Sequence, residues 1–190
     1  MEMVVLLSED GEAIGTVPKA DVHTTQTALH LAFSCYVMNE DGKLLVTRRA
    51  LDKRTWPGVW TNSFCGHPAP GEDMQLAIAR RAADELGATV GEVQVVLPDF
   101  RYRAVDASGI VENEVCPVHI ARLHGELTPR PDEVVEWAWV DPHTLAEAVE
   151  RAPFAFSPWL AMQLPQLLER LGQAENPNAD ASAPLDGRDS

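Results

Sequence analysis

No stretch of the 190-residue sequence approaches the roughly 20 apolar residues that a membrane-spanning helix requires. Cysteine is scarce, and its count of three is odd, which argues against a framework of disulfide bonds. The first ten residues have no basic segment and soon turn acidic, which argues against a secretory signal. These absences predict a reduced, cytoplasmic protein that has no membrane partner.

Basic residues are also few. The 15 lysines and arginines face 29 acidic residues, and the resulting net charge of −14 argues against a nucleic-acid partner. Charge alone leaves two explanations open for the cations that are present, a local site for an anion and ordinary solvated side chains. Eight of the 15 fall in three short stretches: Arg48, Arg49, Lys53 and Arg54; Arg80 and Arg81; Arg101 and Arg103.

Turn residues and apolar spacing predict a series of strands and helices. Residues 1–17 are predicted to form a small β-hairpin. Pro117 is expected to mark a strand edge or a bulge, and Pro165 a kink or a break in the last helix. Further strands are expected at 29–38, 43–49, 93–97, 100–105, 114–123 and 134–140, and helices at 72–86, 141–151 and 157–171.

This order of elements predicts the α/β (α+β) class, with a mixed β-sheet packed between helices and an N-terminal β-hairpin extension. Residues 1–172 are expected to form a single domain. Residues 173–190 are mostly Ala, Pro, Asn, Asp and Ser, and contain one large apolar residue, Leu185. Such a composition predicts a disordered tail that catalysis does not need.

Cys65 and His67 lie two residues apart, ahead of the best predicted helix. This spacing offers a reactive thiol beside a possible metal ligand. A lone cysteine is more often a small buried hydrophobic residue. The pair by itself therefore leaves both interpretations open.

Glu112 and Glu114 are two residues apart in a predicted strand, so their side chains are expected on one face. A divalent cation would relieve the repulsion between two such carboxylates, although both could equally be solvated on an outer face. With His23, His30 and His67 they would form a mixed nitrogen and oxygen site of octahedral type. Such a site suits Mn²⁺, Fe²⁺ or Zn²⁺, but sequence spacing cannot show that these segments meet.

The stretch from 66 to 87 resembles a degenerate Nudix box, the loop and helix of enzymes that handle X-linked diphosphates. In Nudix hydrolases a glutamate follows the arginine of the box and helps to hold the Mg²⁺ that drives hydrolysis. Arg81 stands at that position here, which should weaken metal binding and the activation of water. Of the two acidic positions that come next, the first is Asp84 and only Glu85 keeps the full match; the other residues of the segment are Gly66, Glu72, Arg80 and Gly87.

The presence of Arg81 in place of the hydrolase glutamate points to one branch of the Nudix superfamily. Over about residues 1–171 the chain resembles the type 1 isopentenyl diphosphate isomerases, and the combination of matching stretches is highly specific. The resemblance implies a Nudix-like fold and the conversion of isopentenyl diphosphate to dimethylallyl diphosphate by paired proton transfers. The matching stretches are residues 29–33, 45–49, 56–62, 65–68, 99–103, 112–114 and 156–159.

The resemblance also implies roles for particular residues. Cys65 and Glu114 would be the two acid–base groups, Tyr102 would lie within hydrogen-bond reach of Glu114, and Trp159 would stabilise a carbocation through its indole face. From the residue type alone, Trp159 would be taken as a core aromatic. One Mn²⁺, or Zn²⁺ or Fe²⁺ in its place, would be bound by His23, His30, His67, Glu112 and Glu114.

The diphosphate is expected to need its own cations. By the same resemblance Lys19, Arg49 and Lys53 would bind it, Arg81 would face it or orient Glu85, and Glu85 would hold a Mg²⁺ that arrives with it. Phe33, Trp56 and Trp60 are expected to wall a dry pocket. The partner is thus a small prenyl diphosphate, and the chain is expected to act as a monomer.

Two other functions compete with the isomerase. A Nudix pyrophosphohydrolase would act on a nucleotide or prenyl diphosphate, and a diphosphate-sensing module would bind without catalysis. A hydrolase should carry Glu where this chain has Arg81. A sensor has no need to keep Cys65, Tyr102, Glu114 and Trp159 together.

Overall fold

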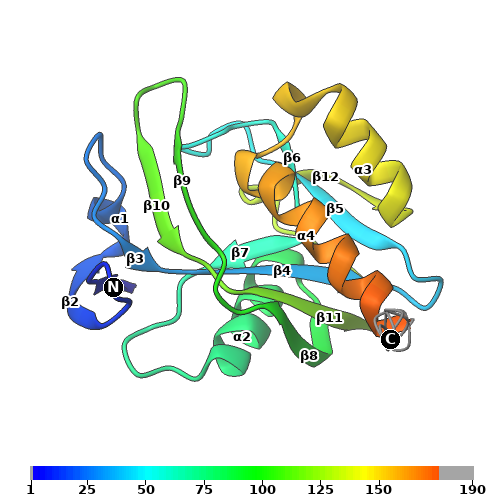
Figure 1. Ribbon diagram of the computed structural model, residues 1–190, viewed down its shortest axis with the longest axis horizontal. Coiled ribbons are helices and arrows are strands. Elements are labelled where there is room, and N and C mark those ends of the chain that lie inside the picture. The colour runs from blue at the N-terminus through cyan, green and yellow to red at the C-terminus, as the bar shows by residue number, and fades with distance from the viewer. Residues whose placement is uncertain (1, 176–190) are drawn as a thin grey trace, which may run out of the picture.

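The computed structural model describes residues 2–175, and its strands form two mixed sheets (Figure 1). The first sheet has the order β2-β1-β3-β10-β9. Its strands are β1 (Met3–Leu7), β2 (Ala13–Pro18), β3 (His30–Leu31), β9 (Arg101–Val105) and β10 (Val111–Val115). The β1–β2 pair is the N-terminal hairpin that the sequence predicted.

The second sheet has seven strands, in the order β12-β5-β4-β11-β8, with β6 beside β5 and β7 beside β4. Within it β4 and β11 run parallel, and the other pairs are antiparallel. The strands are β4 (Phe33–Met38), β5 (Leu44–Arg49), β6 (Trp60–Thr61), β7 (Phe64–Gly66), β8 (Thr89–Leu97), β11 (Val118–His124) and β12 (Val134–Val140).

Helices cover both faces of the second sheet. Side chains alternate along β4, so Tyr36 packs with α3 (Pro142–Arg151) and α4 (Pro158–Glu175), whereas Cys35 and Val37 pack with α2 (Met74–Leu86). The remaining helices are the short α1 (Lys19–Val22) and the 3-10 turn η1 (Pro153–Ala155). The predicted α/β (α+β) class, with a sheet packed between helices, is confirmed.

Two predicted strands are wrong in the same way, because each is divided between the two sheets. The predicted strand 29–38 consists of β3 and β4, which are separated at Ala32, and the predicted strand 114–123 consists of β10 and β11, separated at Cys116 and Pro117. Pro117 has no N–H for a ladder, and its carbonyl accepts from the Ser34 N–H at 3.1 Å. The two crossings run side by side, since β3 pairs with β10 and β4 with β11.

The helix boundaries also differ from the predictions in detail. Helix α2 begins at Met74 instead of residue 72, because the Asp73 side chain accepts from the Gln75 and Leu76 N–H groups. Helix α4 passes through Pro165 without a break and continues to Glu175. Residues 176–190, most of the predicted tail, lie outside the described residues.

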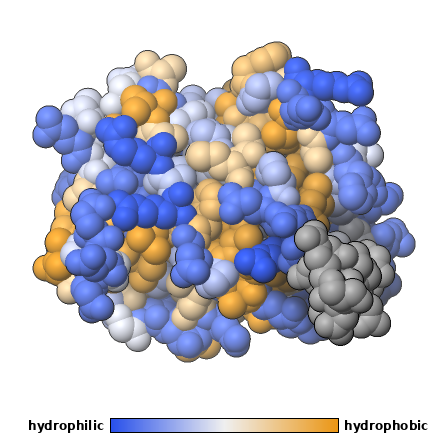
Figure 2. Space-filling view, viewed as in Figure 1, coloured by the Kyte–Doolittle hydropathy of each residue, from blue (hydrophilic) through white to orange (hydrophobic). Residues whose placement is uncertain are grey.

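None of the helices within residues 2–175 is both long enough and apolar enough to cross a bilayer. Hydrophilic residues cover much of the face shown in Figure 2, with hydrophobic residues between them. This surface agrees with the acidic composition of the chain.

Candidate active site

A pocket of about 530 Å³ is lined by residues from both sheets and from the loops beside them. It collects most of the side chains that the sequence singled out. His30 and Glu85 do not line it, but each is buried against a lining residue, His67 and Arg81 respectively. The predicted site residues that line the pocket are Lys19, His23, Arg49, Lys53, Cys65, His67, Arg81, Tyr102, Glu112, Glu114 and Trp159.

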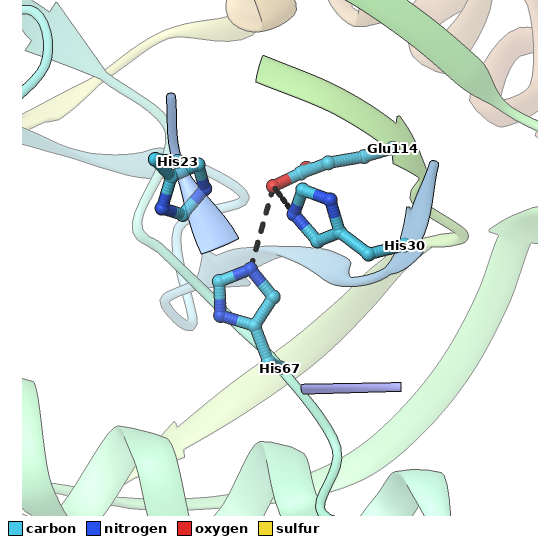
Figure 3. Close-up of side chains that lie close together, drawn as sticks. All are labelled: His23, His30, His67 and Glu114. Atoms are coloured by element: carbon cyan, nitrogen blue, oxygen red, sulfur yellow. Dashed lines mark ion pairs between the residues drawn. The ribbon is translucent and has the colours of Figure 1, made fainter. Parts of the chain in front are cut away.

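Three imidazoles and one carboxylate converge beside the crossing between the sheets (Figure 3). His23 follows α1, His30 lies in β3, His67 follows β7, and Glu114 in β10 is directly opposite His30 in the parallel β3–β10 pair. One ligand atom from each lies within 4.8 Å of all the others. Ligands about 2.0–2.2 Å from one ion are at most roughly 4.4 Å apart, so a slight contraction would close this group on a metal.

The hydrogen bonding of His30 fits a metal ligand. Its Nδ1 is 2.9 Å from the Ala28 carbonyl oxygen, which can only accept. In the neutral ring, Nε2 therefore carries a lone pair, and it faces Glu114 Oε1 at 3.4 Å. Nε2 of His23, His30 and His67 all lack a hydrogen-bond donor or acceptor partner within residues 2–175. Buried acceptors that face one another need a cation between them.

The pKa of the Glu114 carboxyl and that of the His67 ring are shifted toward the forms that bind a metal. Burial alone would raise the pKa of the Glu114 carboxyl, but His30 and His67 outweigh it and hold that pKa well below its usual value. Burial lowers the pKa of His67 and favours its neutral ring. Burial also acts to lower the pKa of His30, yet Glu114 beside it raises the net value, so this carboxylate already attracts a cation. Ionised carboxylate and neutral imidazole are the forms that bind metals.

Glu112 lies next to this cluster. As predicted, it shares a face with Glu114: both are buried, while Asn113 between them is half-buried. Its Oε2 is 2.7 Å from His23 Nε2, and its Oε1 accepts from the Thr55 hydroxyl at 3.0 Å. The five residues predicted as metal ligands thus meet in one place.

Cys65 and Tyr102 approach Glu114 from different sides. Cys65 belongs to β7 in the seven-stranded sheet, and burial raises the pKa of its thiol to about 12. Tyr102 in β9 is directly opposite Glu114 in the antiparallel pair, and burial, followed by the nearby Glu114 charge, raises its pKa well above the usual value. Tyr102 and Glu114 share a face of their sheet, but among the described residues no hydrogen bond joins their side chains.

Trp159, in the first turn of α4, presents its ring to the pocket and is 97% covered, since only 3% of it is exposed. The Arg49 guanidinium carbon lies 5.3 Å from its ring centroid, so this indole already accepts a cation. Its Nε1 donates to Asn62 Oδ1 at 2.9 Å. Tyr102 and Trp56 pack against it, with ring centroids 6.0 and 5.4 Å away.

The predicted aromatic wall is wrong. None of Phe33, Trp56 and Trp60 lines the pocket in the part of the chain that the structure describes. Phe33 belongs to the core on the α2 face of the sheet, where it packs with Phe64, because alternation along β4 turns it away from the site. Trp56 packs edge to face against the Trp159 ring.

The sequence left open whether the three basic stretches form a local site for an anion. Two of the three basic stretches contribute lining residues, whereas the third does not: Arg101 pairs with Glu9 at the surface. Lys19 pairs with Glu2 at 3.0 Å, and the Arg49 side chain donates to the Thr55 and Trp56 carbonyls.

Arg81 is the centre of a cluster of ion pairs. Its Nη2 is 2.6 Å from Glu85 Oε2, the pair expected from their spacing, and 2.9 Å from Glu133 Oε2. Its Nε donates to the Cys65 carbonyl at 3.2 Å. Glu133 also pairs with Lys53. Glu133 was not predicted, because a single acidic residue before a strand gives no signal that distinguishes it from a surface charge.

The loop and helix of the predicted box are confirmed. Glu72 accepts from Arg80 at 2.7 Å and from the Ala69 N–H at 2.7 Å, and the Arg80 bond lowers the pKa of Glu72 to about 2. Gly66 permits the close approach of the loop, since a Cβ atom there would lie 2.8 Å from Phe33. The loop is thereby held where Arg81 reaches the Cys65 carbonyl.

Comparison with known proteins agrees with this geometry. The NUDIX domain family model matches residues 28–160. An isopentenyl-diphosphate Delta-isomerase of Paenarthrobacter aurescens is 62% identical over 168 residues, which cover 88% of this chain and 91% of that protein. This chain belongs to the isopentenyl-diphosphate Delta-isomerase family. Another member, from Clavibacter sepedonicus, is 64% identical over 87% of each chain.

Solved structures place this isomerase family member in the Nudix fold. A protein of Deinococcus radiodurans matches with a TM-score of 0.69 and 18% identity, covering 87% of this chain and 99% of that one. A MutT Nudix hydrolase of Burkholderia pseudomallei matches with a TM-score of 0.56 and 21% identity, covering 73% and 97%. At such identities the likeness shows the fold alone.

Proposed function

We propose that the chain converts isopentenyl diphosphate to dimethylallyl diphosphate. The observation that carries the proposal is one pocket in which the Cys65 thiol, the Glu114 carboxylate and the Trp159 ring lie beside five basic side chains. The relatives that share about three fifths of the sequence are isopentenyl-diphosphate Delta-isomerases. The small prenyl diphosphate is the substrate, and the monomeric state and cytoplasmic location expected from the sequence stay predictions.

The reaction needs a proton donor and a proton acceptor on different sides of the five-carbon unit. Cys65 and Glu114 suit this pair, because they enter the pocket from different sheets. Proton addition to the alkene leaves positive charge on a tertiary carbon. Trp159 faces that charge, and a desolvated cation–π contact contributes about 2 kcal/mol or more. Tyr102, on the same face as Glu114, orients this carboxylate.

The diphosphate is bound by Lys19, Arg49, Lys53 and Arg81. Glu85 holds the Mg²⁺ that comes with the diphosphate, since Mg²⁺ favours one or two carboxylates together with phosphate oxygens. The structure offers a reason for such a cation: burial and the neighbouring Glu133 raise the pKa of Glu85 even though Arg81 is paired with it. A second positive charge would stabilise its ionised form.

His23, His30, His67, Glu112 and Glu114 bind one divalent transition metal, with Mn²⁺, Zn²⁺ and Fe²⁺ as the candidates. When bound, the metal supplies positive charge that keeps Glu114 ionised and fixes its orientation. The support is the set of mutually facing acceptor atoms that lack partners.

The metal site predicts a difference between two histidine variants. The wild-type protein should bind one equivalent of Mn²⁺ or Zn²⁺ and melt at a lower temperature after chelation, because the ion binds the folded state alone. His30→Ala should lose this metal, whereas His143→Ala, which alters an exposed histidine of α3, should keep it. Elemental analysis and thermal melting measure both. Full metal content in His30→Ala would contradict the proposed ligand set.

Product analysis tests the activity itself. Purified protein incubated with isopentenyl diphosphate, Mg²⁺ and Mn²⁺ should form dimethylallyl diphosphate, which proton and phosphorus NMR distinguish from the substrate. Release of phosphate would indicate the pyrophosphohydrolase instead, and unchanged substrate would indicate a binding module. Arg81 at the position of a hydrolase glutamate predicts that phosphate release will be absent.

A further inference from the structure

The Asn62 side chain is fully buried between Cys65 and Trp159 and has no part in the chemistry described so far. Its Oδ1 accepts from the Trp159 indole N–H at 2.9 Å and from the Cys65 thiol at 3.4 Å. The same oxygen accepts from the Thr61 hydroxyl at 3.0 Å. One carbonyl oxygen therefore contacts both the thiol and the indole of the proposed active site.

The orientation of this amide is fixed by its other end. Asn62 Nδ2 donates to the Cys35 carbonyl at 3.1 Å and to the Phe64 carbonyl at 2.8 Å. The opposite orientation would set Oδ1 against two carbonyl oxygens and the NH₂ group against the indole N–H, which can only donate. Oδ1 is thus an acceptor at the site, within reach of both the indole N–H and the Cys65 thiol.

A second contact holds the sulfur from another direction. Ser34 Oγ lies 3.4 Å from Cys65 Sγ. Ser34 accepts from Gln163 Nε2 at 2.9 Å, and Gln163 Oε1 accepts from the Tyr36 hydroxyl at 3.1 Å, in a chain whose members are all fully buried. Since Ser34 accepts from Gln163, its own hydrogen is free for a sulfur atom. The position of the thiol is therefore set by neighbours that cannot easily move.

We propose that Asn62 is a positioning residue for the isomerisation, because its one carbonyl oxygen fixes the Cys65 sulfur and the Trp159 ring relative to each other. This inference rests on the proposed function. The sulfur has to lie next to one carbon while the indole face lies against the charge that develops on its neighbour. Two groups held by the same atom keep this relation in every turnover.

The test compares three variants in the metal-loaded enzyme. Asn62→Leu keeps the number and branching of the side-chain heavy atoms but neither accepts nor donates a hydrogen bond. Its kcat should fall about 100-fold, the effect of a displacement of roughly 1 Å at a reacting group. Its KM for isopentenyl diphosphate should change by less than about threefold, because loss of an interaction used in the transition state spares ground-state binding. The proposed diphosphate cations make no hydrogen bond to Asn62 in the described chain.

Asn62→Asp is the conservative variant, since a protonated carboxyl keeps the acceptor oxygen and can donate to one of the two carbonyls. It should retain kcat within about tenfold of the wild type. Ser63→Ala is the matched control. Ser63 is also fully buried, and its hydroxyl accepts from the Val37 N–H and donates to the Leu45 carbonyl, away from the site. It should lose stability while kcat stays near the wild-type value.

A readout independent of turnover is the NMR signal of the Trp159 indole N–H, identified by its absence in Trp159→Phe. The signal should shift in Asn62→Leu and stay unchanged in Ser63→Ala. Equal loss of kcat in Asn62→Leu and Ser63→Ala, or an unshifted indole signal in Asn62→Leu, would overturn the inference. If Asn62→Leu does not fold, Asn62→Asp decides, and kcat lowered beyond about 100-fold with an unshifted indole signal would overturn the inference. Failure of the proposed function is separate, because the wild type itself would then form no allylic product.

Discussion

Cys65→Ala is expected to abolish isomerisation while the protein remains folded. A general acid or base typically contributes about 10²–10⁴-fold, and the loss here should exceed about 10⁴-fold because water cannot protonate an unactivated alkene in its place. The fold should survive, since Cys65 faces the pocket and its only hydrogen bonds through sulfur among the described residues are the long contacts to Asn62 and Ser34. Turnover of isopentenyl diphosphate and circular dichroism measure the two effects.

Cys35→Ala is the matched control for this variant. Cys35 is fully buried on the α2 face of β4, away from the pocket, so its replacement should reduce stability but leave turnover close to the wild-type rate. Residual activity of Cys65→Ala above about a tenth of the wild type would remove the thiol from the acid–base pair. A different residue of the pocket would then have to act in place of Cys65.

Glu114→Gln should also abolish turnover, and it should weaken the transition metal at the same time. The amide keeps the shape of the side chain, but it cannot act as a base and offers the metal a neutral oxygen. The His30 and His67 rings, whose proximity holds the pKa of Glu114 down, would lose the negative charge that they face. Metal content therefore has to be measured in the same preparation as the rate.

The combination of the two measurements separates the roles of Glu114. Loss of activity with full metal content would assign the proton transfer to Glu114 directly. Loss of both would show that Glu114 is a ligand, and activity restored by excess Mn²⁺ would argue against its role as a base. Glu136→Gln, which alters an exposed partner of Arg48, should behave as the wild type in both respects.

The proposed anion site would explain how so acidic a chain binds a diphosphate. Lys53 and Arg81 share the half-buried carboxylate of Glu133, and Arg81 is paired with Glu85 as well. These pairs hold the cations in the pocket before substrate arrives, which reduces the side-chain entropy lost on binding. Local arrangement of charge, and not the net charge of −14, thus governs this site.

The local features of this protein can be predicted from its residues and their spacing. The β1–β2 hairpin follows from a turn between two apolar runs, and α2 ends where Gly87 adopts a positive φ of 57°. Glu112 and Glu114 share a face because alternation is a property of the strand backbone. Such features depend on neighbours in the chain, so composition and spacing are enough to predict them.

How the segments meet depends on the three-dimensional packing of the chain. Nothing near Ala32 or Pro117 in the sequence shows that two apolar runs pass from one sheet to the other at the same place, yet this double crossing brings His30 beside Glu114. Glu133 joins the site through its contact with Arg81, which is 52 residues away in the chain. Asn62 joins it through its contact with Trp159, which is 97 residues away. Strand pairing and burial of this kind arise from the packing of the whole chain, which residue spacing does not encode.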